Sequence, residues 1–100
     1  MGIRISHGGP SARSGLTIEI LGQHLAHTLT GSEWREVSDL FDGSFADIVS
    51  IPPREADRIG DLLHKAARHG LMPANWGDLA IEIGNAAHRA ARAGQNWEWN

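Results

Sequence analysis

Apolar side chains recur at the three- and four-residue spacing of an α-helix in four stretches of the chain. This spacing gives each helix one apolar face, so all four helices are predicted to pack on a common core. The predicted helices cover residues 16–29, 30–41, 52–69 and 74–93. Ser14 is placed to cap the first helix, Thr30 and Glu33 match a capping box, and Pro52-Pro53 suits a first helical turn. Gly70 and Gly94 are predicted to end the third and fourth helices.

Both ends of the chain alternate apolar and polar residues, which is the pattern of a strand with one buried face. Ile3 and Ile5 alternate with polar residues near the start, and Trp97 and Trp99 do so near the end. A lone strand leaves its backbone groups unpaired, so we expect the two end segments to pair with each other. Residues 44–51 are less regular and are expected to form a loop or a single turn. The predicted fold is α+β and mainly helical, with a small two-stranded sheet.

The composition is that of an ordinary globular chain, and residues 1–100 suffice for one domain with a modest core. The chain has no cysteine, which excludes disulfides and thiolate chemistry. Its net charge of −3 argues against a general nucleic-acid-binding protein, because such proteins carry basic surfaces. The sequence contains no long apolar run and no signal peptide, so we expect a cytoplasmic protein that does not bind membranes.

Six histidines and four tryptophans stand out in a chain with two phenylalanines and no tyrosine. His24 and His27 lie at positions i and i+3 of the first predicted helix, where both imidazoles can reach one metal ion. Such a site needs at least one further ligand from elsewhere in the chain. The structural alternative is that His27 faces solvent while His24 borders the apolar face of its helix.

A loop rich in glycine and serine begins with His7, Gly8 and Gly9 and contains Arg13. The backbone amides of such a loop can hold an anion beside a helix N-terminus, with Arg13 adding positive charge. Neither glycine-rich nucleotide-binding motif is present, so the simpler interpretation is a connection between a strand and a helix. The serines of the loop also lack the sequence context of a serine hydrolase.

The four tryptophans fall into two groups. Trp34 and Trp76 lie on apolar helix faces and are expected in the core. Two strands need not fully cover two indole rings, and tryptophan is enriched in protein interfaces, so we expect Trp97 and Trp99 to contact a partner protein. Burial of both rings in the core is the structural alternative. Ile81 lies on the outer side of the fourth predicted helix and is a weaker candidate for such a contact.

Four short stretches are distributed along most of the chain, between residues 5 and 99. They are residues 5–9 with His-Gly-Gly, residues 21–29 with the paired histidines, Pro52-Pro53, and residues 90–99 with Trp-Glu-Trp. In these stretches the chain resembles a group of small uncharacterised proteins of actinobacteria and their phages. The resemblance implies that the loop, the histidine pair and the Trp-x-Trp segment belong to one architecture. It also implies a cytoplasmic bacterial or phage setting, and it transfers no activity and no catalytic residues.

No complete catalytic constellation is present, so we expect a protein that is not an enzyme and uses no cofactor. Our preferred hypothesis is a small protein-interaction module, as in a bacterial or phage modulator of a host protein. Its partner would be another protein or a second copy in a homodimer, rather than nucleic acid. Two alternatives stay open, namely an anion- or metal-binding protein and an acidic nucleic-acid mimic. The mimic would expose one acidic stripe formed by Glu33, Glu36, Asp39, Asp42 and Asp47.

Overall fold

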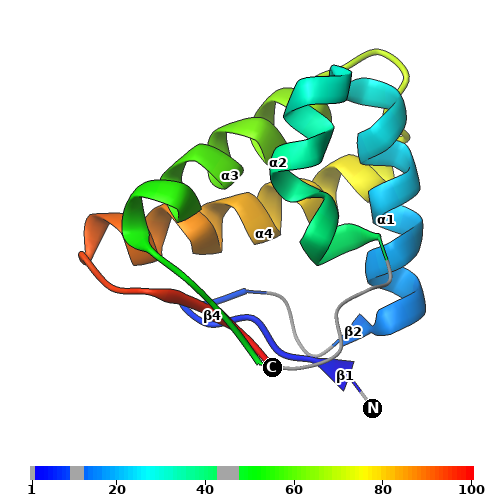
Figure 1. Cartoon of the computed structure of the whole chain (residues 1–100). Coiled ribbons are helices and arrows are strands. Elements are labelled where there is room, and N and C mark those ends of the chain that lie inside the picture. Colours follow the sequence, from blue (N-terminus) through cyan, green and yellow to red (C-terminus); the bar gives the residue numbers. More distant parts are fainter. Residues whose placement is uncertain (1, 10–12, 43–47) are drawn as a thin grey trace.

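The computed structural model describes residues 2–9, 13–42 and 48–100. The helices in this part are α1 (Gly15–Thr28), α2 (Gly31–Phe41), α3 (Pro53–Ala67) and α4 (Ala74–Arg92). Its strands are short: β1 (Gly2–Ile3), β2 (Arg13–Ser14), β3 (Val49–Ile51) and β4 (Trp97–Trp99). The prediction of a mainly helical α+β fold with four helices is confirmed (Figure 1). Within the described residues, no helix combines the length and the apolar character needed to cross a bilayer.

The helix starts follow the predicted capping signals. The side chain of Ser14 accepts a hydrogen bond from the backbone N–H of Thr17 at 3.1 Å, which caps α1. At α2 the hydroxyl of Thr30 accepts from the N–H of Glu33, and the carboxylate of Glu33 accepts from the N–H of Thr30. This reciprocal pair is the capping box, and it satisfies two backbone amides that a helix start otherwise leaves free.

One of the two predicted helix stops is confirmed and the other is wrong. Gly94 follows α4 with a φ of +66°, a left-handed conformation that glycine adopts without steric cost. The N–H of Gln95 then bonds to the carbonyl of Ala90, which closes the helix end. Gly70 does not end α3, because the helix already stops at Ala67 with Arg68 as its cap.

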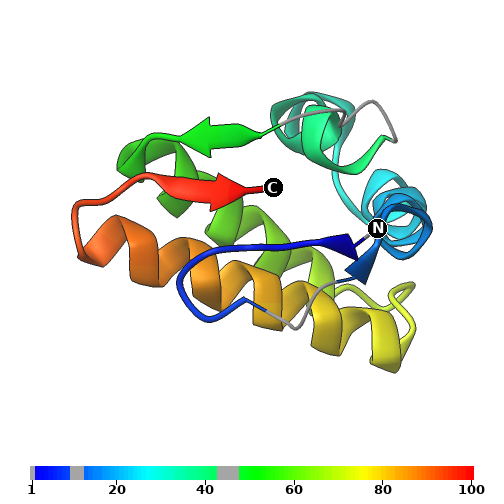
Figure 2. The same cartoon turned by 90° about the horizontal axis from the view of Figure 1, so that it is seen from below.

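The sheet has β4 as its middle member, between β3 and the start of the chain (Figure 2). On one side β4 pairs antiparallel with β3, and Ser50 lies opposite Glu98. On the other side the N–H of Arg4 donates to the carbonyl of Asn100 at 2.7 Å. The N–H of Asn100 donates back to the Arg4 carbonyl at 2.9 Å. The predicted pairing of the two end segments is therefore confirmed at residues 4–6, whereas Ile3 pairs with Arg13 of β2 instead.

The expectation of a loop or turn over residues 44–51 is wrong at residues 49–51, which form β3. Residues 44–47 of this segment lie outside the described residues. The strand is only three residues long, and its pairing partner β4 lies far away in the sequence. A strand this short has too few alternating positions to be recognised, so tertiary pairing decides its conformation.

The inner face of β4 belongs to the core. Trp97 and Trp99 are both 0% exposed, and their rings meet edge to face with centroids 5.3 Å apart. Phe41 at the end of α2 packs edge to face on Trp99 at 5.4 Å. Neither ring is exposed in the folded chain, and the expected contact of Trp97 and Trp99 with a partner stays a prediction. The sheet gains a third segment and lies against the helices, which cover both rings.

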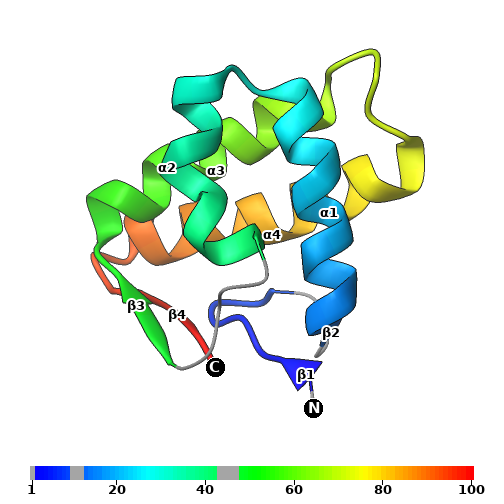
Figure 3. The same ribbon diagram turned by 45° about the vertical axis from the view of Figure 1, so that its right-hand side comes forward.

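The helices α3 and α4 run antiparallel, and α1 and α2 pack across them (Figure 3). Two glycines set how closely α3 and α4 approach. The ring of His88 occupies the space beside Gly60, where a Cβ atom would lie 2.5 Å from its Cδ2 and Nε2 atoms. In the same way, a Cβ atom on Gly84 would lie 2.6 Å from Cδ2 of His64. Each histidine thus packs on the glycine of the opposite helix, and the two rings touch with centroids 4.9 Å apart.

This crossing reflects a short repeat that the sequence analysis missed. Residues 59–64 and residues 83–88 both read Ile-Gly-x-x-x-His. In an antiparallel pair, equal spacing of glycine and histidine on the two helices produces two matching contacts about a local two-fold axis. The repeat is therefore a packing device as well as a sequence pattern.

Candidate functional site

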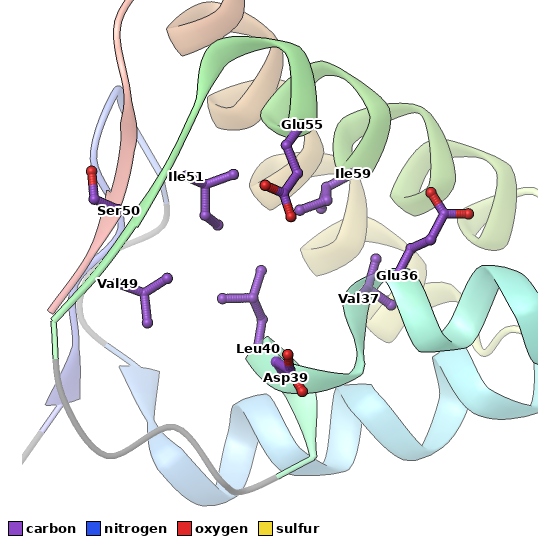
Figure 4. A pocket seen from close by; sticks show the side chains of 9 residues that line it. All are labelled: Glu36, Val37, Asp39, Leu40, Val49, Ser50, Ile51, Glu55 and Ile59. Carbon is purple, nitrogen blue, oxygen red and sulfur yellow. The ribbon is translucent and has the colours of Figure 1, made fainter.

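Three elements, α2, β3 and α3, surround a hollow of about 170 Å³ on the protein surface (Figure 4). We call it the α2–α3 hollow. It is lined by Glu36, Val37, Asp39, Leu40, Val49, Ser50, Ile51, Glu55 and Ile59. The apolar members form its floor, the carboxylate of Glu55 points toward it and Asp39 lies at its edge, whereas the carboxylate of Glu36 points away from it.

The local sequence pattern explains why α2 and α3 each present an apolar group and an acid here. On α2, Val37 and Leu40 lie one helical turn apart and face the core, next to the exposed Glu36 and Asp39. On α3, Ile59 lies one turn beyond Glu55 and is buried. The strand β3 closes the hollow with alternate side chains, since successive residues of a strand point to opposite faces.

The acids of α2 differ in their partners. Arg58 binds Glu36 through two hydrogen bonds of 3.0 and 3.2 Å, and this contact lowers the pKa of Glu36. Lys65 binds Glu33, and this hydrogen bond, helped by the backbone N–H of Thr30, lowers the pKa of Glu33 to about 2. Both pairs tie α2 to α3 and neutralise the first half of the acidic helix.

Two carboxylates of the hollow have no such partner. Among the described residues, no lysine, arginine or histidine forms an ion pair with Asp39 or Glu55. Both residues are exposed. The hollow therefore has a negative rim over an apolar floor.

The size of the hollow limits what it can hold. Cofactor and drug-sized sites usually enclose about 300–1,000 Å³. At about 170 Å³ the α2–α3 hollow matches one long side chain better than a cofactor. An apolar floor with a negative rim favours a chain of methylene groups that ends in a cation.

The predicted acidic stripe of a nucleic-acid mimic is not a free row of charges. Glu33 and Glu36 are paired with Lys65 and Arg58 of α3, and the side chain of Glu33 is only 14% exposed. Asp47 lies outside the described residues. Since two of the five acids are neutralised by neighbouring cations, the structure weakens the mimic hypothesis.

The paired histidines of α1 do not converge with further ligands. His27 is exposed, and its Nδ1 lies 2.7 Å from the carbonyl of Gln23. His24 is partly buried, and its ring stacks at a tilt on Trp76 with centroids 5.5 Å apart. Among the described residues, no third metal-ligating side chain joins this pair.

The loop at His7 is held by contacts within the protein. The Nδ1 atom of His7 lies 2.8 Å from the hydroxyl of Ser6, and its Nε2 lies 2.8 Å from Oε1 of Gln95. Arg89 donates to the carbonyls of His7 and Gly8 at 2.6 and 2.9 Å. Both ring nitrogens of His7 are therefore engaged, which leaves neither free for a metal.

The remaining loop residues also have structural roles. Gly9 packs so closely on Ile5 that a Cβ atom at residue 9 would lie 2.7 Å from Cβ of Ile5. Arg13 belongs to β2, which pairs with β1. These contacts agree with the simpler interpretation, in which the loop joins a strand to a helix.

Ile81 is 39% exposed on α4, so its predicted outward position is confirmed. Its role as a partner contact stays a prediction. The α2–α3 hollow was missed because its two unpaired acids come from elements that β3 brings together. The density of acids along residues 33–42 was the available signal, and it pointed to α2 without showing the apolar floor.

Comparison with known proteins places the chain in a family. No curated protein and no solved structure matches it. A family model does match over residues 6–100, which include every residue that lines the α2–α3 hollow. This agrees with the expectation of a family without an assigned activity. The match covers nearly the whole chain, and the chain therefore belongs to the family described as a domain of unknown function, DUF7739.

Proposed function

We propose that this chain is a small protein-interaction module that accepts a basic side chain of its partner in the α2–α3 hollow. The observation that carries the proposal is the apolar floor beside the carboxylates of Asp39 and Glu55, neither of which forms an ion pair within the described residues. Lysine and arginine bury their methylene stems on apolar surfaces while their charged ends stay at a polar edge. The hollow offers both environments within the length of one such side chain.

Electrostatics supports a cationic group over a neutral one. Asp39 and Glu55 form no ion pair with any residue that the structure describes, and a partner's guanidinium or ammonium group would supply the missing cation. Arginine is the better fit, because a guanidinium group can bind carboxylates through two parallel hydrogen bonds. Arg58 already makes this kind of contact with Glu36 at the edge of the hollow.

The partner under this proposal is a basic segment of another protein in the same cell. The resemblance to proteins of actinobacteria and their phages favours a bacterial cytoplasm, where the chain would act as a modulator of a host protein. A second copy of the chain is the other occupant to test. Sedimentation over a wide range of protein concentrations, at low and at high salt, decides between the two occupants. Self-association through the charged hollow must weaken at high salt.

The direct test uses a blocked arginine, N-acetyl-arginine N-methylamide, as the probe in an NMR titration of the chain. The control probe is the citrulline analogue, which has nearly the same shape and no charge. We expect the arginine probe to shift the amide signals of Val37, Leu40 and Ile51 with millimolar affinity, and the citrulline probe to shift them much less. Equal shifts with both probes, or no shifts at the hollow, would contradict the proposal.

A matched pair of variants separates the hollow from general attraction to an acidic protein. Asp39→Asn with Glu55→Gln removes the two unpaired charges of the hollow. Asp78→Asn with Glu82→Gln removes two exposed charges from α4, away from the hollow. We expect the first double variant to lose the arginine-specific shifts and the second to keep them. If both double variants lose the arginine-specific shifts, the net charge of the protein, and not the hollow, would account for the binding.

A further inference from the structure

A cluster of metal-ligating side chains lies at the crossing of α3 and α4, and its acids occupy a different face of α3 from that of the α2–α3 hollow. Asp57 and Asp61 are one helical turn apart, so both face the same way. The Nε2 atom of His88 on α4 lies 3.0 Å from Oδ1 of Asp61 and 4.0 Å from Oδ1 of Asp57. One ligand atom from each residue falls within 4.8 Å of the others.

The imidazole of the cluster is held in place by packing. The side chain of His88 is only 16% exposed, whereas Asp57 and Asp61 are 61% and 62% exposed. Its ring reaches the two acids because Gly60, between them on α3, has no side chain to block it. The cluster therefore combines a fixed nitrogen with two carboxylates that are free to adjust.

The repeat at the crossing provides an internal comparison. The positions on α4 that match Asp57 and Asp61 are occupied by Ile81 and Asn85. His64, the counterpart of His88, has its Nε2 atom buried without a hydrogen-bond partner among the described residues. Packing of histidine on glycine thus requires no carboxylate. The two acids beside His88 are therefore an addition to the packing device, and Asp61 already forms a hydrogen bond with Nε2 of His88 at 3.0 Å.

We propose that Asp57, Asp61 and His88 bind a divalent transition-metal ion of the zinc type. Imidazole nitrogen and carboxylate oxygen are both ordinary zinc ligands, at about 2.0–2.2 Å from the metal. Ligand atoms at that range in a tetrahedron stand about 3.4 Å from one another. The separations of 3.0 and 4.0 Å from His88 bracket this value, and all three ligand atoms lie within 4.8 Å of one another, so the exposed acids need only close in on the ion to complete the site.

The fourth position of the metal is open to solvent. Asp57 also lines a shallow surface hollow together with Arg54 and Arg92. A water molecule or a small anion reaching the metal from this side would meet two positive charges. The site would therefore resemble the open, three-ligand zinc sites more than the closed structural ones.

The test uses the chain without a purification tag. Calorimetric titration with Zn²⁺ measures affinity and stoichiometry, and Co²⁺ gives an independent visible absorption signal. We expect one ion per chain near neutral pH and a weaker interaction at low pH, because metal binding requires unprotonated ligands. His88→Gln should weaken binding by about tenfold or more. Asp57→Asn should also weaken it, and this exposed residue can change without disturbing the crossing.

Two control variants make the result decisive. His27→Gln removes an exposed histidine of the alternative pair, and Asp78→Asn removes an exposed acid of α4. Both should keep wild-type affinity for Zn²⁺. Unchanged affinity in Asp57→Asn and His88→Gln, or a loss in His27→Gln equal to that in His88→Gln, would overturn the proposal. The arginine probe does not report on this site, so the two proposals fail independently.

Discussion

Gly60 and His88 share a space that holds only one side chain. A Cβ atom at residue 60 would lie 2.5 Å from two atoms of the imidazole and 3.0 Å from the carbonyl oxygen of Gly84. These distances are shorter than ordinary contacts between non-bonded atoms. The helices α3 and α4 therefore approach closely only because residue 60 is glycine.

Gly60→Ala should destabilise the protein by about 1–3 kcal/mol, the usual cost of forcing an extra group into a packed site. Gly70→Ala is the matched control, since no atom lies within 4 Å of a Cβ at residue 70. Urea denaturation followed by circular dichroism measures both. A Gly60→Ala variant as stable as the Gly70→Ala variant would mean that the two helices can separate without cost.

The buried position of Trp97 leads to a second prediction. Trp97→Ala should cost about 3–5 kcal/mol, because it leaves a large cavity under the sheet. Trp97→Phe should cost less, since it keeps most of the apolar volume. It also removes a buried indole N–H that has no partner among the described residues. Thermal denaturation compares the stability of the two variants. If both lose the same stability, the N–H group that both substitutions remove, rather than the ring volume, would account for the energetic role of Trp97.

Arg89 should control the order of the loop at His7. Its guanidinium group donates to the carbonyls of His7 and Gly8, which lie 82 and 81 residues away in the sequence. Arg89→Gln should raise the amide exchange rates of Gly8 and Gly9 and cost about 1 kcal/mol in stability. Arg92→Gln, at the end of the same helix, should leave these rates unchanged. Exchange rates that do not differ between the variants would show that other contacts hold the loop.

The Lys65–Glu33 pair predicts a pH dependence with a defined sign. The pKa of Glu33 falls from 4.5 to about 2 in the folded chain, so the folded state favours its ionised form. The stabilisation is then fully present above pH 4.5 and is lost as the pH falls through about 2. Urea denaturation should show a stability difference between wild type and Glu33→Gln that shrinks between these pH values. A constant difference would assign the role of Glu33 to hydrogen bonding that is independent of charge.

The sequence predicted the parts of the fold that depend on neighbouring residues. Helical periodicity located four helices. The hydroxyls of Ser14 and Thr30 cap two helix starts, and Gly94 adopts the left-handed conformation that ends α4. The pairing of the chain ends was also predicted, because two short strands with one apolar face each leave few other partners. These features follow from local spacing and from the need to pair backbone groups.

The parts that the sequence did not predict depend on distant residues. Val49–Ile51 becomes a strand only because β4 lies beside it, and this third segment of the sheet leads to the burial of Trp97 and Trp99. The α2–α3 hollow needs the same strand as its wall. The cluster at His88 forms because Gly60 faces α4. The repeated Ile-Gly-x-x-x-His pattern does not show this until the pairing of α3 and α4 is known.

The middle position of β4 sets an order of events in folding. Ser6 and Glu98 are 92 residues apart, yet the hydroxyl of Ser6 accepts the N–H of Glu98 within the sheet. Contacts of such long range form slowly, whereas α3 and α4 are joined by a short turn and can meet early. During synthesis β3 and residues 4–6 are made before β4, so the backbone groups with which they pair to β4 stay unpaired until β4 is present. The helical hairpin should therefore be the folding nucleus, and closure of the sheet the last step.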